Sequence, residues 1–554
     1  MFDHTKYRPF PSINKVNRNW PNQSITQAPI WCSVDLRDGN QALIEPMNVE
    51  QKLLMWDLLI DMGFKEIEIG FPSASQTDFD FARTLIENNK IPRDVTIQAL
   101  VQARSSLIER TFEALSGAHQ AIVHVYNSTS PVQREKVFDL DKQGIIDIAA
   151  FGARKVKECA QKQVNTKWTF QYSPESFSST EVDFAIDVCN KVINTWSPTP
   201  ENKCIINLPA TVECAAPNVF ADQVETFCEN INHRENVIIS IHTHNDRGCA
   251  IAAAEMAILA GADRIEGTLM GNGERTGNMD IITMGMNLYS QGINPNLDFS
   301  DASRITRVVE DCTKIPTHAR HPWVGDLVYT AFSGSHQDAI KKCLSKQIEN
   351  KPWDVAYLPI DPSDIGRDYQ SVIRVNSQSG KGGVAYILES QYDIKLPRWM
   401  QIEVSQAVQS YTESNECEVT AETIWEIYQD SFCTIKNDTN IKSYQVSNDD
   451  GQENISAFID YLGHNTHIKG SGKGAIDAFC KALSQQYGHS IDIKQFEQSS
   501  MGGHKNSLAI SMIHMTINEQ KIIASASDPD SLKSSLLCIL TGLSRYTKQT
   551  RSAA

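Results

Sequence analysis

Residues 236–269, NVIISIHTHNDRGCAIAAAEMAILAGADRIEGTL, contain the pattern that decides the fold. Two short runs rich in apolar and β-branched residues, NVIISIHTH (236–244) and DRIEGTL (263–269), flank a longer segment, and the polar residues Asn245 and Asp246 follow the first run directly. Short apolar runs of this length, bounded by turn residues, are typical of buried strands. The stretch therefore predicts one unit of an alternating strand and helix pattern.

The same unit recurs through the first half of the chain. From residue 29 to about residue 295, strand-like runs alternate with amphipathic segments such as residues 49–62 and 143–160. Eight such units over about 240 residues predict an α/β fold, a closed parallel (β/α)8 or TIM barrel. A doubly wound open sheet is disfavoured because no glycine-rich fingerprint follows the first strand. The predicted strands are residues 30–36, 65–71, 95–101, 120–126, 167–173, 203–209, 236–244 and 263–269.

The rest of the chain has two other patterns. We expect residues 1–300 to form an N-terminal extension with the barrel, and residues 301–437 to form helical linker or lid subdomains. Residues 438–554 alternate short strands with two helices, which predicts an α+β domain of two strand-rich repeats. In the first repeat, strands at 441–446 and 455–460 precede the glycine-rich turn GSGKG (470–474).

The composition excludes several classes of protein. The 554 residues contain 51 Lys and Arg against 67 Asp and Glu, and a net charge of −16 disfavours nucleic-acid binding. The most apolar segment, residues 250–262, is shorter than the roughly 20 residues that span a bilayer, and residues 1–20 lack the apolar core of a signal peptide. The 13 cysteines occur without a CxxC pair. We expect a cytoplasmic protein that neither binds nucleic acid nor crosses a membrane.

The loops that leave the carboxyl ends of barrel strands contain the residues suited to catalysis. His242 and His244 lie two apart on a predicted strand, so both imidazoles point the same way. With Asp38, which follows the first strand, they make a face of two histidines and one carboxylate that suits a divalent metal. These donors accept Mg²⁺, Mn²⁺ or Zn²⁺. The alternative is a pair of surface imidazoles at a strand end.

Other rim residues have two interpretations each. Arg37 is a fork suited to a carboxylate or an oxyanion, or a partner in a structural ion pair. Glu175 could abstract a proton or orient a histidine, or it is a solvated rim charge. The loop GNGERTGN (271–278) could let backbone amides approach a phosphate, or it is a tight turn. His336 precedes a helix outside the barrel, as a capping residue or as part of a lid.

Seven segments together closely resemble the 2-isopropylmalate synthase family in its longer form, over the chain from near the N-terminus to about residue 400. The motifs LRDGNQ and HTHND alone indicate only the wider family of metal-dependent acyl-CoA aldol enzymes, which includes homocitrate synthase, citramalate synthase and hydroxymethylglutaryl-CoA lyase. IEPM, YSPESF and SQSGKGG narrow the resemblance from this wider family to the 2-isopropylmalate synthase family. The segments are DLRDGNQALIEPM (35–47), YNSTS (126–130), YSPESF (172–177), NLPATVE (207–213), HTHND (242–246), GNGERTGN (271–278) and VNSQSGKGGVAY (375–386).

The resemblance implies an acyltransferase of leucine biosynthesis that condenses acetyl-CoA with 3-methyl-2-oxobutanoate and hydrolyses the thioester to 2-isopropylmalate and CoA. It implies a divalent metal, Mg²⁺ before Mn²⁺ or Zn²⁺, with K⁺ as an activator. Asn278 matches a residue near the metal, and His124 and Thr211 match positions that line the oxo-acid pocket. Arg37 would steady the oxygen that becomes an alkoxide.

The resemblance also assigns the acetyl-CoA chemistry. It pairs Glu175 with His336, assisted by Tyr369, to remove a proton from the acetyl methyl group, and it places Glu274 on the acetyl-CoA side. His336 and Tyr369 lie in the linker region, which in the family reaches over the active site of the partner subunit. The expected assembly is therefore a homodimer.

The C-terminal region resembles the family's leucine-binding regulatory domain more loosely. Gly470, Gly472 and Gly474 stand where the family commonly has GxGNGP, and we expect leucine to inhibit there. An altered or absent response is the alternative, because Lys473 could fill space that the ligand requires. The rival functions are homocitrate or citramalate synthase, since one or two methylenes give only about 10–200-fold discrimination, and a non-catalytic amino-acid sensor.

Overall fold

The computed structural model describes residues 3–11, 13, 15–367, 381–415, 419–433, 439–449, 451–501 and 507–553. The chain forms two compact units. The first comprises Met1–Val328 with Ser363–Arg367, and the second comprises Tyr329–Pro362 with Asp368–Ala554. In the described part of the chain, every helix is too short or too polar to span a bilayer.

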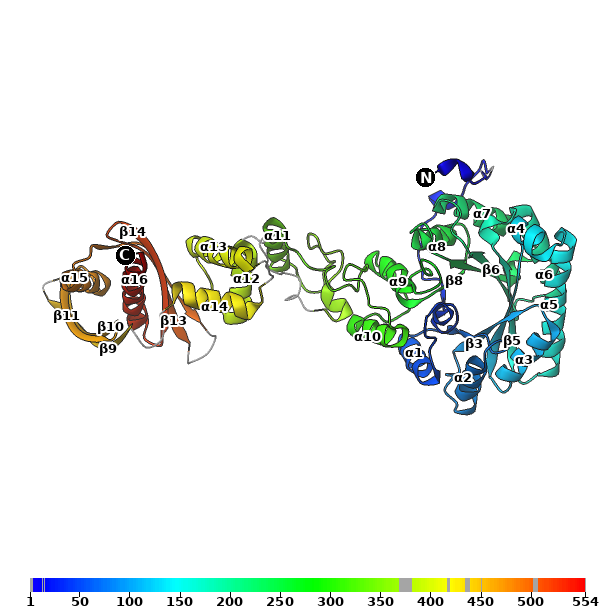
Figure 1. Ribbon diagram of the computed structural model, residues 1–554, viewed down its shortest axis with the longest axis horizontal. Helices are drawn as coiled ribbons and strands as arrows, with labels where there is room; N and C mark the ends of the chain where they lie inside the picture. Colours follow the sequence, from blue (N-terminus) through cyan, green and yellow to red (C-terminus); the bar gives the residue numbers. More distant parts are fainter. Residues whose placement is uncertain are drawn as a thin grey trace. The chain divides into compact units, whose positions relative to one another are not determined.

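The first unit is a closed barrel of parallel strands surrounded by helices (Figure 1). The strands follow one another in sequence order and the last pairs with the first, with Trp31 opposite Ile265. All eight predicted strands are present, so the barrel is confirmed over the doubly wound sheet. The strands are β1 (Ile30–Ser33), β2 (Glu66–Gly70), β3 (Thr96–Gln102), β4 (Gln120–Ser128), β5 (Lys167–Glu175), β6 (Cys204–Ala210), β7 (Val237–Thr243) and β8 (Arg264–Gly267).

The barrel helices follow from amphipathic spacing and capping residues. In α5 (Lys142–Lys162), the side chain of Asp141 accepts a hydrogen bond from the backbone N–H of Gly144 at the N-terminus. Ile145, Ala149 and Val156 of this helix are buried against the barrel. The other helices of this unit are α1 (Val49–Asp61), α2 (Gln76–Glu87), α3 (Ser105–Leu115), α4 (Pro131–Gln133), α6 (Val182–Trp196), α7 (Pro217–Asn230), α8 (Ala250–Leu259), α9 (Ile281–Ser290) and α10 (Ala302–Thr313).

Helix α10 lies with the barrel, although it falls within the residues predicted as linker. It packs against α1 and belongs to the first compact unit. Its buried face, formed by Ile305, Val308, Val309 and Cys312, explains this position. The predicted domain boundaries after residues 300 and 437 remain predictions.

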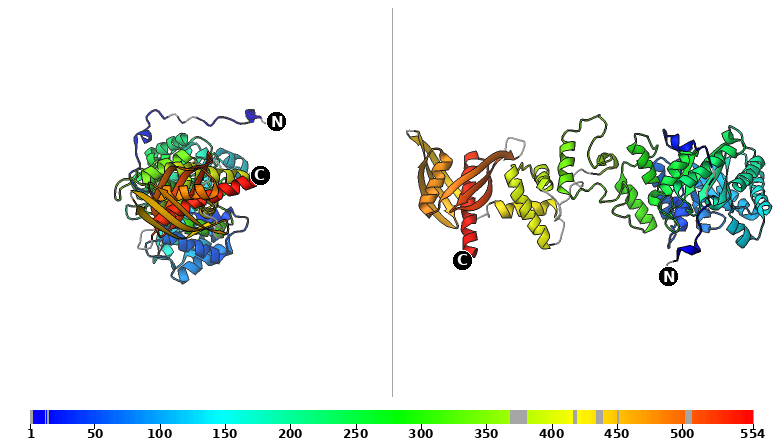
Figure 2. Two further views of the ribbon diagram at one scale, coloured as in Figure 1. Left: turned by 90° about the vertical axis from the view of Figure 1, so that its left-hand side faces the viewer. Right: turned by 90° about the horizontal axis from the view of Figure 1, so that it is seen from above.

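The second unit combines helices with two antiparallel three-stranded sheets (Figure 2). Strands β9 (Thr439–Asp449), β10 (Gln452–Tyr461) and β11 (His464–Gly472) precede α15 (Ala475–Tyr487). Strands β12 (Ile491–Met501), β13 (Leu508–Ile517) and β14 (Gln520–Asp528) precede α16 (Ser531–Ala553). The two strand-rich repeats, each ending in a helix, are thus confirmed, and they share one apolar core. The helices before them are α11 (Gly334–Leu344), α12 (Lys381–Tyr392), α13 (Arg398–Asn415) and α14 (Ala421–Phe432).

The predicted glycine-rich turn at residues 470–474 is wrong in one respect, because its first three residues end a third strand, β11. This strand escaped prediction because it begins with polar residues, HNTH, and shows no clear apolar alternation. A Cβ on Gly470 would lie 2.4 Å from the carbonyl oxygen of Ala478, and one on Gly472 would lie 2.5 Å from the backbone nitrogen of Ala478. Close packing of β11 against α15 therefore requires both glycines. The effector role of Gly470, Gly472 and Gly474 remains a prediction.

We predict that Gly470→Ala lowers the stability of the second unit by about 1–3 kcal/mol, because the added methyl group forces β11 and α15 apart. The neighbouring Ser471 faces away from this contact and is exposed, so Ser471→Ala is the matched control and should change stability by less than about 0.5 kcal/mol. Denaturant unfolding monitored by circular dichroism measures both. Equal stabilities would contradict the packing explanation.

Candidate metal centre and active site

A single π-helical turn, Asp35–Gly39, connects β1 to the barrel mouth and carries Arg37 and Asp38. Asp35 is buried and anchors this turn to the end of β8, since its carboxylate accepts the backbone N–H of Leu269 at 2.9 Å. Burial raises the pKa of Asp35 to about 7. On the other side, the buried ammonium of Lys52 donates to the carbonyl oxygen of Leu36 at 2.9 Å. The turn is therefore held from both sides.

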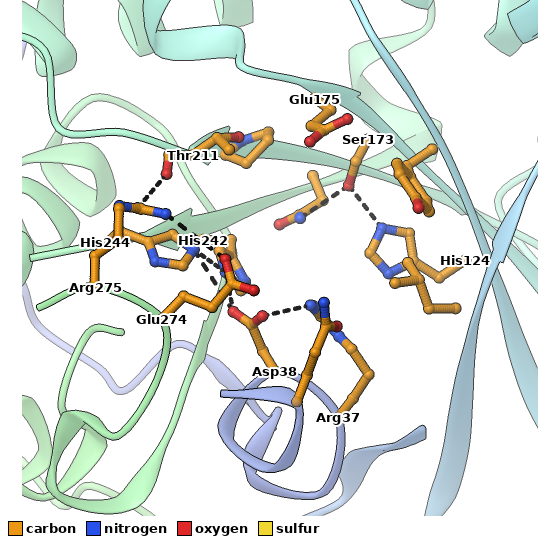
Figure 3. A pocket seen from close by; sticks show the side chains of 15 residues that line it. Arg37, Asp38, His124, Ser173, Glu175, Thr211, His242, His244, Glu274 and Arg275 are labelled. Carbon is orange, nitrogen blue, oxygen red and sulfur yellow. Dashed lines mark hydrogen bonds and ion pairs between the residues drawn. The ribbon is translucent and has the colours of Figure 1, made fainter. Parts of the chain in front are cut away.

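Asp38, His242 and His244 converge in the barrel mouth (Figure 3). Nε2 of His242 lies 3.2 Å from Oδ2 of Asp38 and 3.2 Å from Nε2 of His244. Nε2 of His244 lies 3.6 Å from the same carboxylate oxygen. All three side chains are buried. The structure thus brings together the three residues that the sequence indicated as metal ligands.

The surroundings of these donors suit a cation. Nδ1 of His242 lies 3.0 Å from Oε2 of Glu266, which leaves Nε2 to face Asp38. Burial opposes a charge on His242, but its hydrogen bonds with Asp38 and Glu266 prevail and raise its pKa to about 9. Burial, followed by the neighbouring His242, lowers the pKa of His244 to about 3. The carboxylates of Asp38 and Glu266, both in contact with His242, therefore favour positive charge at this position.

Asn278 lies beside this cluster, because its backbone forms a bridge with His244. Its Nδ2 donates to the carbonyl oxygen of Asn272 at 2.9 Å. Its Oδ1 is buried and has no hydrogen-bond partner in the described part of the chain. Asp38, His242 and His244 form a donor set that fits a divalent ion, and Asn278 has an unpartnered amide oxygen on the neighbouring loop.

Arg37 joins this cluster to a second chain of buried polar groups. Its guanidinium contacts Asp38 at 2.9 Å and donates from Nε to Glu68. Glu68 in turn lies 2.7 Å from Nδ1 of His124, and Nε2 of His124 lies 2.7 Å from the hydroxyl of Ser173. Burial would raise the pKa of Glu68, but Arg37 and His124 lower it. His124 is thus a fixed wall of the pocket.

Beneath this level the barrel interior contains a buried ion network. Arg264 is fully buried and donates to Glu266 at 2.7 Å, to Glu66 at 2.5 Å and to Gln98 at 2.8 Å. Glu266 accepts a further hydrogen bond from Gln171 at 2.7 Å. Arg264 and the neighbouring histidines hold the pKa of Glu266 well below its usual range against the effect of burial. The network connects the floor of the barrel to His242.

Glu68, Glu266 and Arg264 were not predicted from the sequence as site residues. A usable signal was present, because ionisable residues stand two apart within predicted strands, in EIEIG on β2 and RIEG on β8. Parallel strands buried on both faces are ordinarily apolar throughout. Charged residues at alternate positions of such strands therefore predict a paired network inside the barrel.

A cavity of about 170 Å³ lies at the carboxyl ends of the strands, and Asp38, His242 and His244 line it. Glu175 ends β5 at its edge and accepts a hydrogen bond from the hydroxyl of Ser128. The hydroxyl of Thr211 accepts the backbone N–H of Ser176 at 2.9 Å, and Glu274 is half-exposed at the rim. The lining residues are Arg37, Asp38, Gln41, Leu100, His124, Tyr126, Ser173, Glu175, Asn207, Pro209, Thr211, His242, His244, Glu274 and Arg275.

The loop GNGERTGN folds as a tight turn over one side of this cavity. Asn278 donates its backbone N–H to the carbonyl oxygen of Gly271, and a Cβ on Gly277 would lie 2.0 Å from that oxygen. Within the loop, Arg275 donates to the carbonyl oxygen of Thr211 at 2.6 Å and to Asp246 at 2.6 Å. The glycines are therefore required by close approach, and Arg275 is a lining residue that the sequence analysis did not single out.

The remaining predicted site residues lie elsewhere. His336 is in the second unit, exposed on α11, where its ring stacks on Tyr357 at 4.1 Å. Tyr369 lies outside the described residues, as does most of SQSGKGG. Their roles remain predictions.

Comparison with known proteins identifies the class of this barrel. The family model described as HMGL-like matches residues 28–309, which contain the barrel and all three clustered donors. The chain is thus a barrel protein of a divalent-metal-dependent class. Two further models match the rest: the "Alpha-isopropylmalate synthase, post-catalytic domain-like" model at residues 326–389 and the "LeuA allosteric (dimerisation) domain" model at residues 418–547.

Curated relatives narrow the class to one family. The chain is 52% identical over 551 residues to the 2-isopropylmalate synthase of Pseudomonas entomophila, a match that covers 99% of this chain and 98% of the relative. It is 50% identical over 549 residues to that of Ralstonia pickettii, with 99% and 96% covered. Among solved structures, the Bacillus subtilis HMG-CoA lyase aligns with 52% of this chain and 95% of its own at 20% identity and a TM-score of 0.43. The chain belongs to the 2-isopropylmalate synthase family.

We predict that Arg264→Met destabilises the barrel by about 3–5 kcal/mol, because it removes the cation that pairs with the buried Glu266 and the partly exposed Glu66. Arg304, which pairs with Asp61 at the surface, is the matched control, and Arg304→Met should cost less than about 1 kcal/mol. Thermal and urea unfolding measure both variants. A barrel that tolerates Arg264→Met as well as the control would show that the network does not hold it together.

Proposed function

We propose that the chain condenses acetyl-CoA with 3-methyl-2-oxobutanoate and hydrolyses the thioester, releasing 2-isopropylmalate and CoA. The observation that carries this proposal is the convergence of Asp38, His242 and His244 in a cavity that also contains a buried guanidinium and a carboxylate at its edge. The names of the curated relatives give the product, 2-isopropylmalate, and the resemblance in the sequence motifs implies the two substrates.

Asp38, His242 and His244 would hold the divalent ion, with Asn278 adding an oxygen donor from the neighbouring loop. A bound divalent ion supplies a Lewis acid that polarises the ketone of a chelated 2-oxo acid. We propose Mg²⁺, because Asp38 and Asn278 supply oxygen donors and the substrate would add further oxygens. Mn²⁺ and Zn²⁺ are the alternatives, because both bind imidazole nitrogens.

Arg37 would stabilise the ketone oxygen as it gains negative charge. Its guanidinium is fixed by Asp38 and Glu68, so the positive charge is oriented before the substrate arrives. His124, held between Glu68 and Ser173, and Thr211, held by Ser176, would form two walls of the oxo-acid pocket.

Glu175 would remove the proton from the acetyl methyl group, since its carboxylate lies at the cavity edge. The proton would pass to a carboxylate oxygen while the carbon attacks the ketone. His336 and Tyr369 would assist from the linker of the partner subunit in a homodimer, and Glu274 would lie on the acetyl-CoA side. The LeuA-type match at residues 418–547 supports both the dimer and inhibition by leucine. K⁺ activation and the cytoplasmic location remain predictions.

CoA release tests the reaction directly. With acetyl-CoA and Mg²⁺ or Mn²⁺, we expect release with 3-methyl-2-oxobutanoate to exceed release with pyruvate or 2-oxoglutarate by at least about 10-fold in kcat/KM. The protein's own thiols are subtracted with a sample that lacks the oxo acid, and Asp38→Asn serves as the inactive control. A preference for pyruvate or 2-oxoglutarate would instead support citramalate or homocitrate synthase, and no release with any oxo acid would support the sensor.

Mixing two inactive variants tests the shared site. We expect Asp38→Asn and His336→Ala each to be inactive, and an equal mixture refolded or co-expressed together to recover about a quarter of wild-type activity, because half of the dimers then contain one intact site. Each variant mixed with itself is the control. If the mixture stays inactive while wild type treated the same way recovers, His336 does not act across the dimer.

A further inference from the structure

His242 and His244 differ in how their second ring nitrogen is held. Nδ1 of His242 lies 3.0 Å from the carboxylate of Glu266. Nδ1 of His244 is buried, and the described chain offers it no hydrogen-bond partner. A histidine that binds a metal through Nε2 carries its proton on Nδ1, and a buried N–H without a partner costs about 1–3 kcal/mol. A partner for this nitrogen is therefore required.

A small second cavity lies on that side of the His244 ring. His244 lines both this cavity and the main one, and its two ring nitrogens point away from each other, so with Nε2 beside Asp38 the Nδ1 side is left for the second cavity. The second cavity has a volume of about 10 Å³, close to the space that one water molecule needs. Much of its wall is apolar, formed by Ala210, Phe220 and Ala253.

Glu213 brings the matching acceptor to the same cavity. Its Oε2 accepts the backbone N–H of Arg247 at 2.5 Å, and its own backbone N–H donates to Asp246 at 3.0 Å. Its Oε1 is buried and also lacks a partner within the described ranges. The carboxylate is thus fixed by the loop that follows His244, and one oxygen of it remains available. No direct hydrogen bond joins this oxygen to Nδ1 of His244.

We propose that Glu213 is a positioning residue for the metal centre, and that a single ordered water in this cavity accepts a hydrogen bond from Nδ1 of His244 and donates one to Oε1 of Glu213. The water satisfies two buried groups that otherwise have no partner. The carboxylate selects the tautomer of His244 that leaves Nε2 free for the ion, as Glu266 does directly for His242. This inference rests on the proposed metal site and adds a residue to it.

Glu213→Gln tests the proposal without measuring turnover. The amide can keep an oxygen on the N–H of Arg247, but it then turns an N–H₂ donor toward the cavity, and the acceptor is lost. We expect Mn²⁺ to bind the metal-stripped full-length variant about 10–100-fold more weakly than wild type in calorimetry. Glu235→Gln, the same change at an exposed position before β7, is the matched control and should bind like wild type.

Mn²⁺ binding to the three proteins distinguishes the role of Glu213 from the existence of the metal site. If wild type and the control bind Mn²⁺ and Glu213→Gln binds it equally well, this inference is overturned while the metal site stands. If wild type binds no Mn²⁺, the metal site of the proposed function fails together with it.

A crystal structure of wild type beyond 1.8 Å resolution covers the case in which the variant does not fold. We expect one water within about 3.2 Å of both Nδ1 of His244 and Oε1 of Glu213. A dry cavity, or a different partner on Nδ1, would overturn the proposal.

Discussion

The barrel interior must pair its buried charges, and this constraint shapes the candidate site. Two guanidinium groups, on Arg37 and Arg264, face four carboxylates, on Asp38, Glu66, Glu68 and Glu266. Burying a charge without a partner is expensive, and these carboxylates outnumber the guanidinium groups. A cation beside Asp38, where the two imidazoles converge, would add positive charge to this group.

The same constraint explains why the site is rigid. Three residues that would contact the oxo acid or the ion are held by other buried groups: His242 by Glu266, Arg37 by Glu68, and His124 by Glu68 and Ser173. The anchors stand on β2, β5 and β8, and strands hold their side chains more firmly than loops do. The network of the barrel floor therefore fixes the geometry of the barrel mouth, and stability and catalysis depend on overlapping residues.

The sequence predicted the parts of this arrangement that depend on local periodicity. The alternation of short apolar runs with amphipathic segments predicted the eight strands. The two-residue spacing of His242 and His244 predicted that both imidazoles lie on the same face of their strand. Asp38 lies close to these histidines because closure of the barrel brings β1 beside β8, which is the neighbour of β7. Charged residues two apart on β2 and β8 indicate a buried network, but a local pattern does not specify that Arg264 pairs with Glu66, because the two strands are far apart in sequence.

Other differences have equally physical causes. Strand β11 was missed because it begins with polar residues, and α10 was assigned to the linker because its buried face contacts a helix more than two hundred residues earlier. The unpartnered atoms of Glu213 and His244 could not be found from sequence at all, since they meet only across a cavity. The resemblance to a family supplied roles for His336 and Tyr369 that spacing alone did not.

The central claim is that His242 and His244 bind one divalent ion together with Asp38. Electron spin-echo modulation of Mn²⁺ bound to the full-length protein tests it most directly, because ¹⁴N nuclei of coordinated imidazoles modulate the echo. The account predicts modulation from two imidazole nitrogens, which falls to one in His244→Gln. Bound Mn²⁺ that shows no imidazole nitrogen, or the same modulation in wild type and His244→Gln, would contradict it.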